Sequence, residues 1–194
     1  MNEYDFAERL AWSRGQRSNT HMETIQSLIA GCASVEQTTP ELDRKGIDYI
    51  ARLRGGAALA IDIKERSKGV SDHWSKSPLF NQVEPELTLE YWSVMPYEDQ
   101  PGVVGWTLDE SKLTDYVLYT FDPVDTQEVF LLPFQLLRMA FRRNAVDWMT
   151  HFHPKTCTTN GGNGNGGWTT QSVFVPAWCV IEAVADQMRT NLSS

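Results

Sequence analysis

The chain has 194 residues, of which 41% are hydrophobic, and its formal net charge is −8. This composition matches that of globular domains and excludes wholesale disorder, and the length suits one domain. No apolar run reaches the ~18–20 residues that a membrane-spanning helix needs. The first nine residues are charged and lack the apolar core of a signal peptide. We therefore expect a protein that is neither secreted nor inserted in a membrane.

The three cysteines, Cys32, Cys157 and Cys179, are widely spaced and odd in number. This favours reduced thiols over a disulfide framework and predicts a cytoplasmic location. Charge is distributed unevenly, because residues 44–76 contain eight Lys or Arg and only four Asp or Glu. A basic segment within an acidic chain predicts one local anionic partner.

Apolar periodicity and turn residues predict helices and strands in alternation along the chain. In the first half we expect a helix over 3–12, a helix from 19 or 20 to about 30, a polar connection over 38–45, strands over 46–54 and 57–66, an exposed loop over 67–85 and a strand over 87–95. In the second half we expect a short helix over 108–113, strands over 115–121 and 128–132, a helix over 133–144, a mobile loop over 158–167, a strand over 172–175 and a helix over 176–189. This order predicts a single α/β domain over residues 1–194, with a central mixed β-sheet flanked by helices.

The strands over 46–54 and 57–66 flank Gly55 and Gly56, which is a hairpin signal. On the first strand the odd-numbered Ile47, Tyr49, Ala51 and Leu53 are apolar, and so are Leu59, Ile61 and Ile63 on the second, whereas Asp48, Arg52, Asp62 and Lys64 are even-numbered. Because directly opposed residues share a face, the two apolar faces bury together only if odd pairs with odd. A two-residue turn would break this match, so we predict a three-residue loop with a glycine in the left-handed conformation.

In this register Asp48 lies opposite Asp62 or Lys64, so two carboxylates and a lysine share one face of the hairpin. Like charges side by side cost stability unless a cation or the lysine neutralises them. One interpretation is a solvated strand face with an Asp–Lys ion pair. The other is a ligand site, which the small side chains of Ala58 and Ala60 would leave open.

These residues resemble the motif of the PD-(D/E)XK, or restriction-endonuclease-like, nucleases: Gly46, Ile47 and Asp48 on one strand, then Asp62, Ile63 and Lys64 on its hairpin partner. Ile47 stands where the family usually has proline. The likeness covers about residues 3–121, which would form the core, with C-terminal strands and helices over 128–190. It implies a restriction-endonuclease-like fold and metal-dependent phosphodiester hydrolysis.

The resemblance also implies the role of each motif residue. Asp48, Asp62 and the backbone carbonyl of Ile63 would hold Mg²⁺ or Mn²⁺, which hard oxygen ligands suit. Lys64 would orient the attacking water or stabilise the developing charge.

Other charged residues are candidates for supporting roles. An additional acid would be Glu8, from the first helix, or Glu90, from the strand over 87–95; for both, a solvent-exposed charge is the alternative. The phosphate-binding candidates are Arg52, Arg66 and Lys68.

We therefore predict a divalent-metal-dependent nuclease that hydrolyses nucleic acid, with DNA as the expected polymer, by metal-activated water. Two alternatives stay open: a catalytically inactive nucleic-acid-binding or assembly protein on the same fold, and an enzyme acting on another phosphoester. The sequence leaves strand specificity, the mode of cleavage and the oligomeric state open, with a homodimer among the options.

Overall fold

The computed structural model describes residues 18–67, 74–76, 83–122, 128–152, 154–159 and 167–192. The predicted helix over 3–12, which carries Glu8, lies outside these residues, and so does Lys68. The helices are α2 (Ser18–Leu28), α3 (Pro40–Asp43), α4 (Phe134–His151) and α5 (Ala177–Leu192). The strands are β1 (Cys32–Gln37), β2 (Tyr49–Leu53), β3 (Ala58–Ser67), β4 (Trp74–Lys76), β5 (Val83–Val94), β6 (Val103–Val104), β7 (Tyr116–Asp122), β8 (Phe130–Pro133), β9 (Lys155–Thr159) and β10 (Trp168–Pro176).

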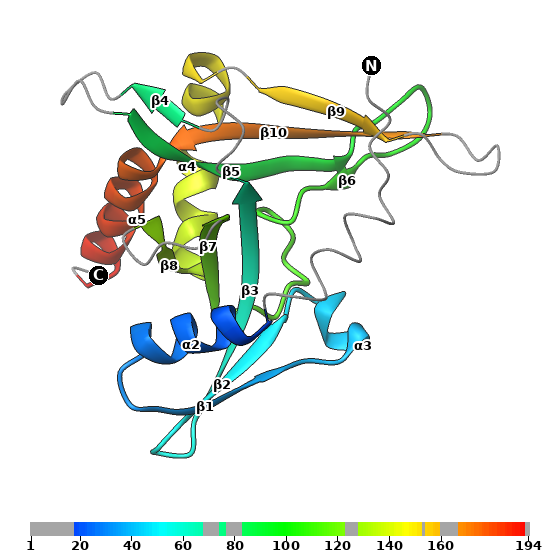
Figure 1. Ribbon diagram of the computed structural model, residues 1–194. Helices are drawn as coiled ribbons and strands as arrows, with labels where there is room; N and C mark the ends of the chain where they lie inside the picture. The colour runs from blue at the N-terminus through cyan, green and yellow to red at the C-terminus, as the bar shows by residue number, and fades with distance from the viewer. Residues whose placement is uncertain are drawn as a thin grey trace.

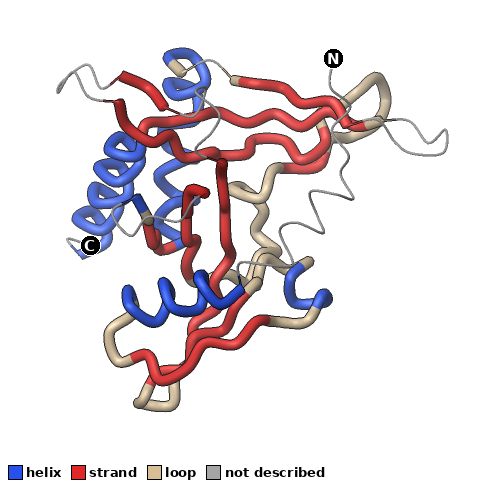
Figure 2. Tube along the Cα trace, in the orientation of Figure 1, coloured by secondary structure: helices blue, strands red, loops and turns tan. Residues whose placement is uncertain are grey.

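The strands form two sheets (Figure 1). The first has the order β1-β2-β3-β7-β8 and is mixed, because β3 and β7 are parallel while the other neighbours are antiparallel. The second has the order β4-β5-β10-β9, with β6 paired to β5, and is antiparallel throughout. Its long strands cross the direction of β3 (Figure 2). The mixed central sheet was predicted; the second sheet was not.

The first sheet has a hydrophobic core on each face. On one face, α2 packs through Ile25 onto Ile61 and Leu118. On the other, Tyr119 and Phe121 share a larger core with β5, β10, α4 and α5. The molecule is therefore a mixed α/β fold whose mixed central sheet is flanked by helices, as predicted. None of the described helices is long and apolar enough to cross a membrane.

The β2–β3 hairpin has the predicted register. Tyr49 pairs with Ile61 and Ala51 with Leu59, so odd-numbered residues oppose odd-numbered residues. The N–H of Leu53 donates to the carbonyl of Ala57 at 2.8 Å, which closes a three-residue loop over 54–56. The last residue of that loop, Gly56, has a φ of 86°. Burial of both apolar strand faces thus decides the loop length, as the alternation of side chains predicted.

Replacing Gly56 by alanine is expected to lower the free energy of unfolding by roughly 1 kcal/mol, because a side chain disfavours the left-handed conformation. Gly55→Ala is the matched control, since Gly55 lies in the same loop without a positive φ and, like Gly56, has no atom within 4 Å of an added Cβ. Urea unfolding of the two variants measures the difference. Equal stabilities would contradict this account of the loop.

Several elements differ from the prediction. The structure contains four strands that were missed, β1, β4, β6 and β9; they are short or polar, and β1 and β9 lie at sheet edges. The expected helix over 108–113 is a series of turns. There the carboxylate of Asp109 accepts the N–H and hydroxyl of Ser111, a local bond that competes with helix formation. Helix α4 extends beyond residue 144 to His151.

Candidate active site

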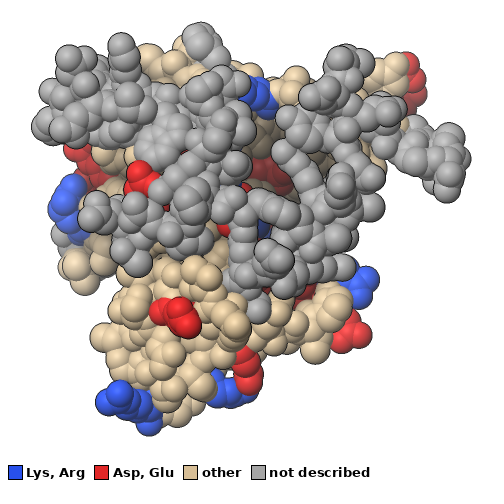
Figure 3. Space-filling model, viewed as in Figure 1, with Lys and Arg blue, Asp and Glu red and all other residues tan. Residues whose placement is uncertain are grey.

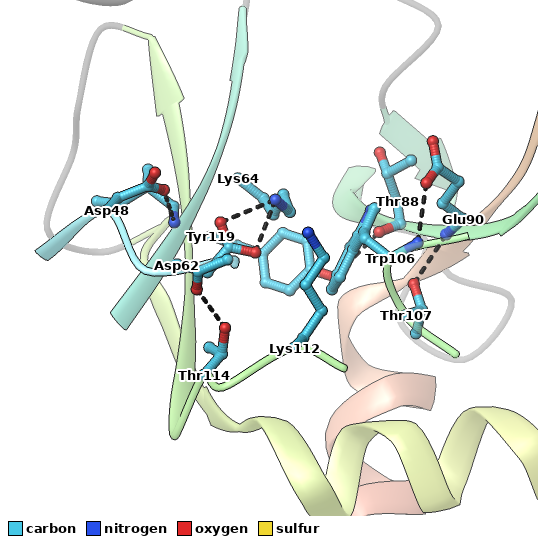
Figure 4. A network of polar contacts seen from close by, with 12 residues as sticks. Asp48, Asp62, Lys64, Thr88, Glu90, Trp106, Thr107, Lys112, Thr114 and Tyr119 are labelled. Carbon is cyan, nitrogen blue, oxygen red and sulfur yellow. Dashed lines mark hydrogen bonds and ion pairs between the residues drawn. The ribbon is translucent and has the colours of Figure 1, made fainter. Parts of the chain in front are cut away.

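The end of the hairpin remote from its loop brings Asp48, Asp62 and Lys64 together (Figure 4). Asp48 directly precedes β2, and its N–H donates to the carbonyl of Ile61 at 2.9 Å. Extending the β2–β3 register by one residue places Asp48 opposite Asp62. The Asp48 carboxylate accepts the N–H of Ile63 at 2.7 Å. On β3, the Lys64 Nζ lies 2.9 Å from Oδ1 and 2.7 Å from Oδ2 of Asp62.

The segment that leads into β7 holds the hairpin in place. The hydroxyl of Thr114 donates to the carbonyl of Gly46, two residues before Asp48. Asp115 donates its N–H to the carbonyl of Ala60 at 2.9 Å, and its carboxylate accepts the Ala60 N–H at 2.8 Å. The segment before β2 that carries Asp48 and the strand β3 that carries Asp62 are therefore both tied to residues 114–115, directly before β7.

The charged face of the hairpin is covered, which corrects the prediction of an open face. Asp62 is only 6% exposed, and the Lys64 side chain 29%. The parallel pairing of β3 with β7 puts Lys64 beside the fully buried Tyr119, on the side of the larger core. The Lys64 Nζ lies 4.7 Å from the ring centroid of Trp106. Both faces of β3 are packed because α2 covers one face of the first sheet and the larger core covers the other.

Burial and neighbouring charges shift the pKa values of Asp48 and Lys64. Burial, and then the charge of Asp62, raise the pKa of Asp48 to about 8, although the Ile63 N–H and Lys64 oppose this shift. Burial lowers the pKa of Lys64, but the carboxylates of Asp62, Asp48 and Glu90 together leave it above its usual value. These shifts favour the protonated form of Asp48 and the charged form of Lys64.

Glu90 does not lie beside the hairpin. Its strand β5 belongs to the second sheet, whereas β3 is flanked by β2 and β7. The Glu90 carboxylate accepts the N–H of Trp106 at 2.9 Å and the hydroxyl of Ser93 at 2.6 Å. Figure 4 shows it apart from the two aspartates, on the far side of Trp106. It is thus a hydrogen-bonded structural acid whose field reaches Lys64, rather than a solvent-facing charge.

The arginines predicted to bind phosphate are engaged within the protein. Arg66 donates to the hydroxyl of Thr88 and lies 4.4 Å from the ring of Phe174, and burial lowers its pKa to about 10. Arg52 forms an exposed ion pair with Glu36. In Figure 3, Lys and Arg side chains are scattered among Asp and Glu where the described surface is visible.

The donor set at the hairpin fits a hard divalent cation. Asp48 and Asp62 offer neighbouring carboxylates, and Mg²⁺ is commonly held by one or two carboxylates together with water and substrate phosphate. After burial, the charge of Asp62 is the next largest cause of the raised pKa of Asp48, and a cation would relieve this repulsion. A cavity of about 300 Å³ adjoins Asp48 and is lined by Gln37, Thr38, Pro40, Asp43 and Asp48. Within the described residues, no group of three or more His, Cys, Asp or Glu is arranged to hold a metal.

Sequence reasoning missed three residues of this site: Trp106, Thr114 and Asp115. The last two directly precede the predicted strand over 115–121 or begin it, where polar side chains commonly anchor a neighbouring backbone. Trp106 follows Gly105 in a turn-rich stretch, and its local sequence does not indicate that it contacts Lys64.

Comparison of the chain with protein-family models, with curated proteins and with solved structures finds no match in any of the three.

Proposed function

We propose that the protein is a divalent-metal-dependent nuclease with a restriction-endonuclease-like fold, acting on nucleic acid and on DNA in particular. The observation that carries the proposal is the cluster of Asp48, Asp62 and Lys64 at one end of the β2–β3 hairpin. A half-buried carboxylate, Asp48, and a buried one, Asp62, beside a lysine cost folding free energy, so their grouping supports a role in ligand binding.

In this proposal Asp48 and Asp62 hold Mg²⁺ or Mn²⁺, with the backbone carbonyl of Ile63 as a further ligand. The metal supplies a more acidic bound water and neutralises charge on the phosphate. Lys64 stabilises negative charge that develops during attack, from a site whose low exposure strengthens the interaction. Because Lys64 bonds both oxygens of Asp62, the ammonium and the metal compete for that carboxylate.

A second candidate function is a catalytically inactive nucleic-acid-binding or assembly protein on the same fold. The observation that favours this second function is the ion pair between Lys64 and Asp62, because Lys64 already neutralises Asp62 without a metal. An enzyme acting on another phosphoester shares the chemistry of the first proposal and differs only in substrate.

The deciding experiment incubates the protein with single- and double-stranded DNA, with RNA and with a small phosphodiester, in Mg²⁺, in Mn²⁺ and in EDTA. The proposal predicts metal-dependent cleavage of DNA that Asp62→Asn removes. Binding of DNA without cleavage in any metal supports the inactive alternative. Turnover of the small phosphodiester alone supports the other phosphoesterase.

Binding to DNA is expected to weaken as salt rises, with a slope that reflects only a few phosphate contacts, because each contact releases counterions from the DNA. Replacing Arg52 and Lys68 together by glutamine should reduce the slope of log K against log [salt] by about 1 for each phosphate-binding side chain removed. Arg142→Gln on α4, which removes an exposed partner of Glu110, is the control and should leave the slope unchanged. Fluorescence anisotropy at several salt concentrations measures both, and an unaltered slope in the double variant would exclude these two side chains from the interface.

A further inference from the structure

The turn over residues 105–107 carries the indole of Trp106 to Lys64, and hydrogen bonds at both of its ends hold it in place. Gly105 N–H donates to the carbonyl of Tyr91 at 2.8 Å, and its own carbonyl accepts the N–H of Leu108 at 2.9 Å. The Glu90 N–H donates to the hydroxyl of Thr107 at 2.9 Å, and the Glu90 carboxylate accepts the Trp106 N–H at 2.9 Å. Backbone and side chain of Glu90 thus hold both ends of the same short turn.

The backbone of the turn at Gly105 lies very close to the backbone of β5 at Glu90. A Cβ added to Gly105 would lie 2.2 Å from the carbonyl oxygen of Glu90 and 2.4 Å from its carbon. No side chain fits at such distances without displacing the turn or β5. The turn is therefore held against Glu90 by steric fit as well as by hydrogen bonds.

The indole is itself fixed by packing. It stacks on Phe134 with ring centroids 6.1 Å apart and planes inclined by 24°, and it lies 6.4 Å from the ring of Tyr119. The Lys64 Nζ meets this ring at 4.7 Å while bonding Asp62 on another side. An ammonium over an indole is attracted by the ring quadrupole, which is largest for tryptophan.

We propose that Glu90 is a positioning residue that acts through Trp106: it anchors the 105–107 turn so that the indole confines the Lys64 ammonium beside Asp62. Its Oε2 already accepts two donors, the Trp106 N–H and the Ser93 hydroxyl, which accounts for its orientation away from the aspartates. The consequence for catalysis rests on the proposed nuclease function, whereas the placement of Lys64 does not.

The test is the NMR signal of Lys64 in the full chain labelled with ¹³C at lysine Cε. The sequence contains six lysines, and Lys64→Arg assigns the signal by its disappearance. Protons above an indole face resonate upfield, so the Lys64 methylene signal should lie upfield of the others and should lose that shift in Trp106→Leu. In Glu90→Ala, the signal should move toward the other lysines because the turn is released.

Two matched variants separate positioning from charge. Glu90→Gln keeps an acceptor oxygen for the Trp106 N–H and should retain the upfield signal, although the negative charge is lost. Ser93→Ala removes the hydroxyl that also donates to the Glu90 carboxylate, and this variant should likewise retain the upfield Lys64 signal. An unshifted signal in Glu90→Ala would overturn the proposal, and so would a Glu90→Gln spectrum that matches Glu90→Ala. If Glu90→Ala does not fold, Gly105→Ala displaces the turn without changing any charge and gives the same readout.

Cleavage assays add the catalytic consequence. Glu90→Ala should lower kcat by about 10- to 100-fold with little change in KM, as loss of a supporting group around a metal site typically does, and Glu90→Gln should restore most of the rate. If wild-type protein cleaves nothing, the nuclease proposal fails, while the lysine signals still decide whether Glu90 positions Lys64.

Discussion

Asp62→Asn is expected to lower metal-dependent cleavage by roughly 10²- to 10³-fold or more, and Lys64→Met by a similar factor, because each removes a charge that acts on the reacting phosphate. Asparagine keeps the shape of Asp62 and still accepts a hydrogen bond from Lys64. Methionine keeps the apolar stem that packs near Trp106. Single-turnover cleavage of labelled DNA in Mg²⁺ and Mn²⁺ measures both effects.

Asp62→Asn is milder than Asp62→Ala for a structural reason. Asp62 is 6% exposed and bonds Lys64 through both oxygens, so Asp62→Ala would leave a partly buried ammonium without its partner and would destabilise the fold. Glu36→Gln is the matched control, since it removes an exposed carboxylate on β1 in the same sheet. Circular dichroism and thermal unfolding establish that the variants fold. Activity within about twofold of wild type in either site variant would reject the mechanism.

The hairpin shows what the sequence could predict. Alternation of Ile61 and Ile63 with Asp62 and Lys64 fixes which side chains share a face, and a one-residue slip would move every apolar side chain of the strand to the other face. Because odd-numbered residues of the two strands must oppose each other, the loop must have three residues. The same register brings Asp48 opposite Asp62. These are local constraints, which is why a single sequence suffices to derive them.

The environment of the hairpin could not be predicted in the same way. Whether the face that carries Asp62 is open or covered depends on β5 and on the turn with Trp106, which lie far from β3 in the sequence. No local pattern of β5 reveals that it joins β10 instead of β3. For Glu90 the missing information is therefore the identity of the strand that pairs with β5.

Asp48 is expected to make the metal-free protein less stable as pH rises from about 4 to about 8. Its pKa is about 8 in the folded protein and near 3.8 in an unfolded chain, so between these values the folded state binds the extra proton. Stability then falls with rising pH, because the unfolded state releases that proton first. Each pKa unit of this shift corresponds to ~1.4 kcal/mol. Even half of the shift therefore lowers the free energy of unfolding by roughly 3 kcal/mol between pH 4 and pH 8.

Asp48→Asn removes the titrating group but keeps an oxygen for the Ile63 N–H, so it should be the more stable protein at pH 8 and nearly equal to wild type near pH 4. Urea unfolding at intervals of pH, in EDTA, measures the difference. Lys45→Gln, an exposed change near Asp48, serves as the control. A pH profile of wild type that parallels that of Asp48→Asn would show that Asp48 is ionised in the folded protein at neutral pH.

The same proton should oppose metal binding, because a carboxylate must lose its proton to bind a cation. Apparent affinity for Mn²⁺ is therefore expected to rise by up to about tenfold per pH unit below pH 8 and to level off above it, with one proton released per ion bound. Calorimetric titration in two buffers of different ionisation enthalpy counts the released protons. Asp48→Asn should bind Mn²⁺ weakly and release none. Tight binding by that variant, with an unchanged proton count, would place the cation on other residues and would remove Asp48 from the proposed site.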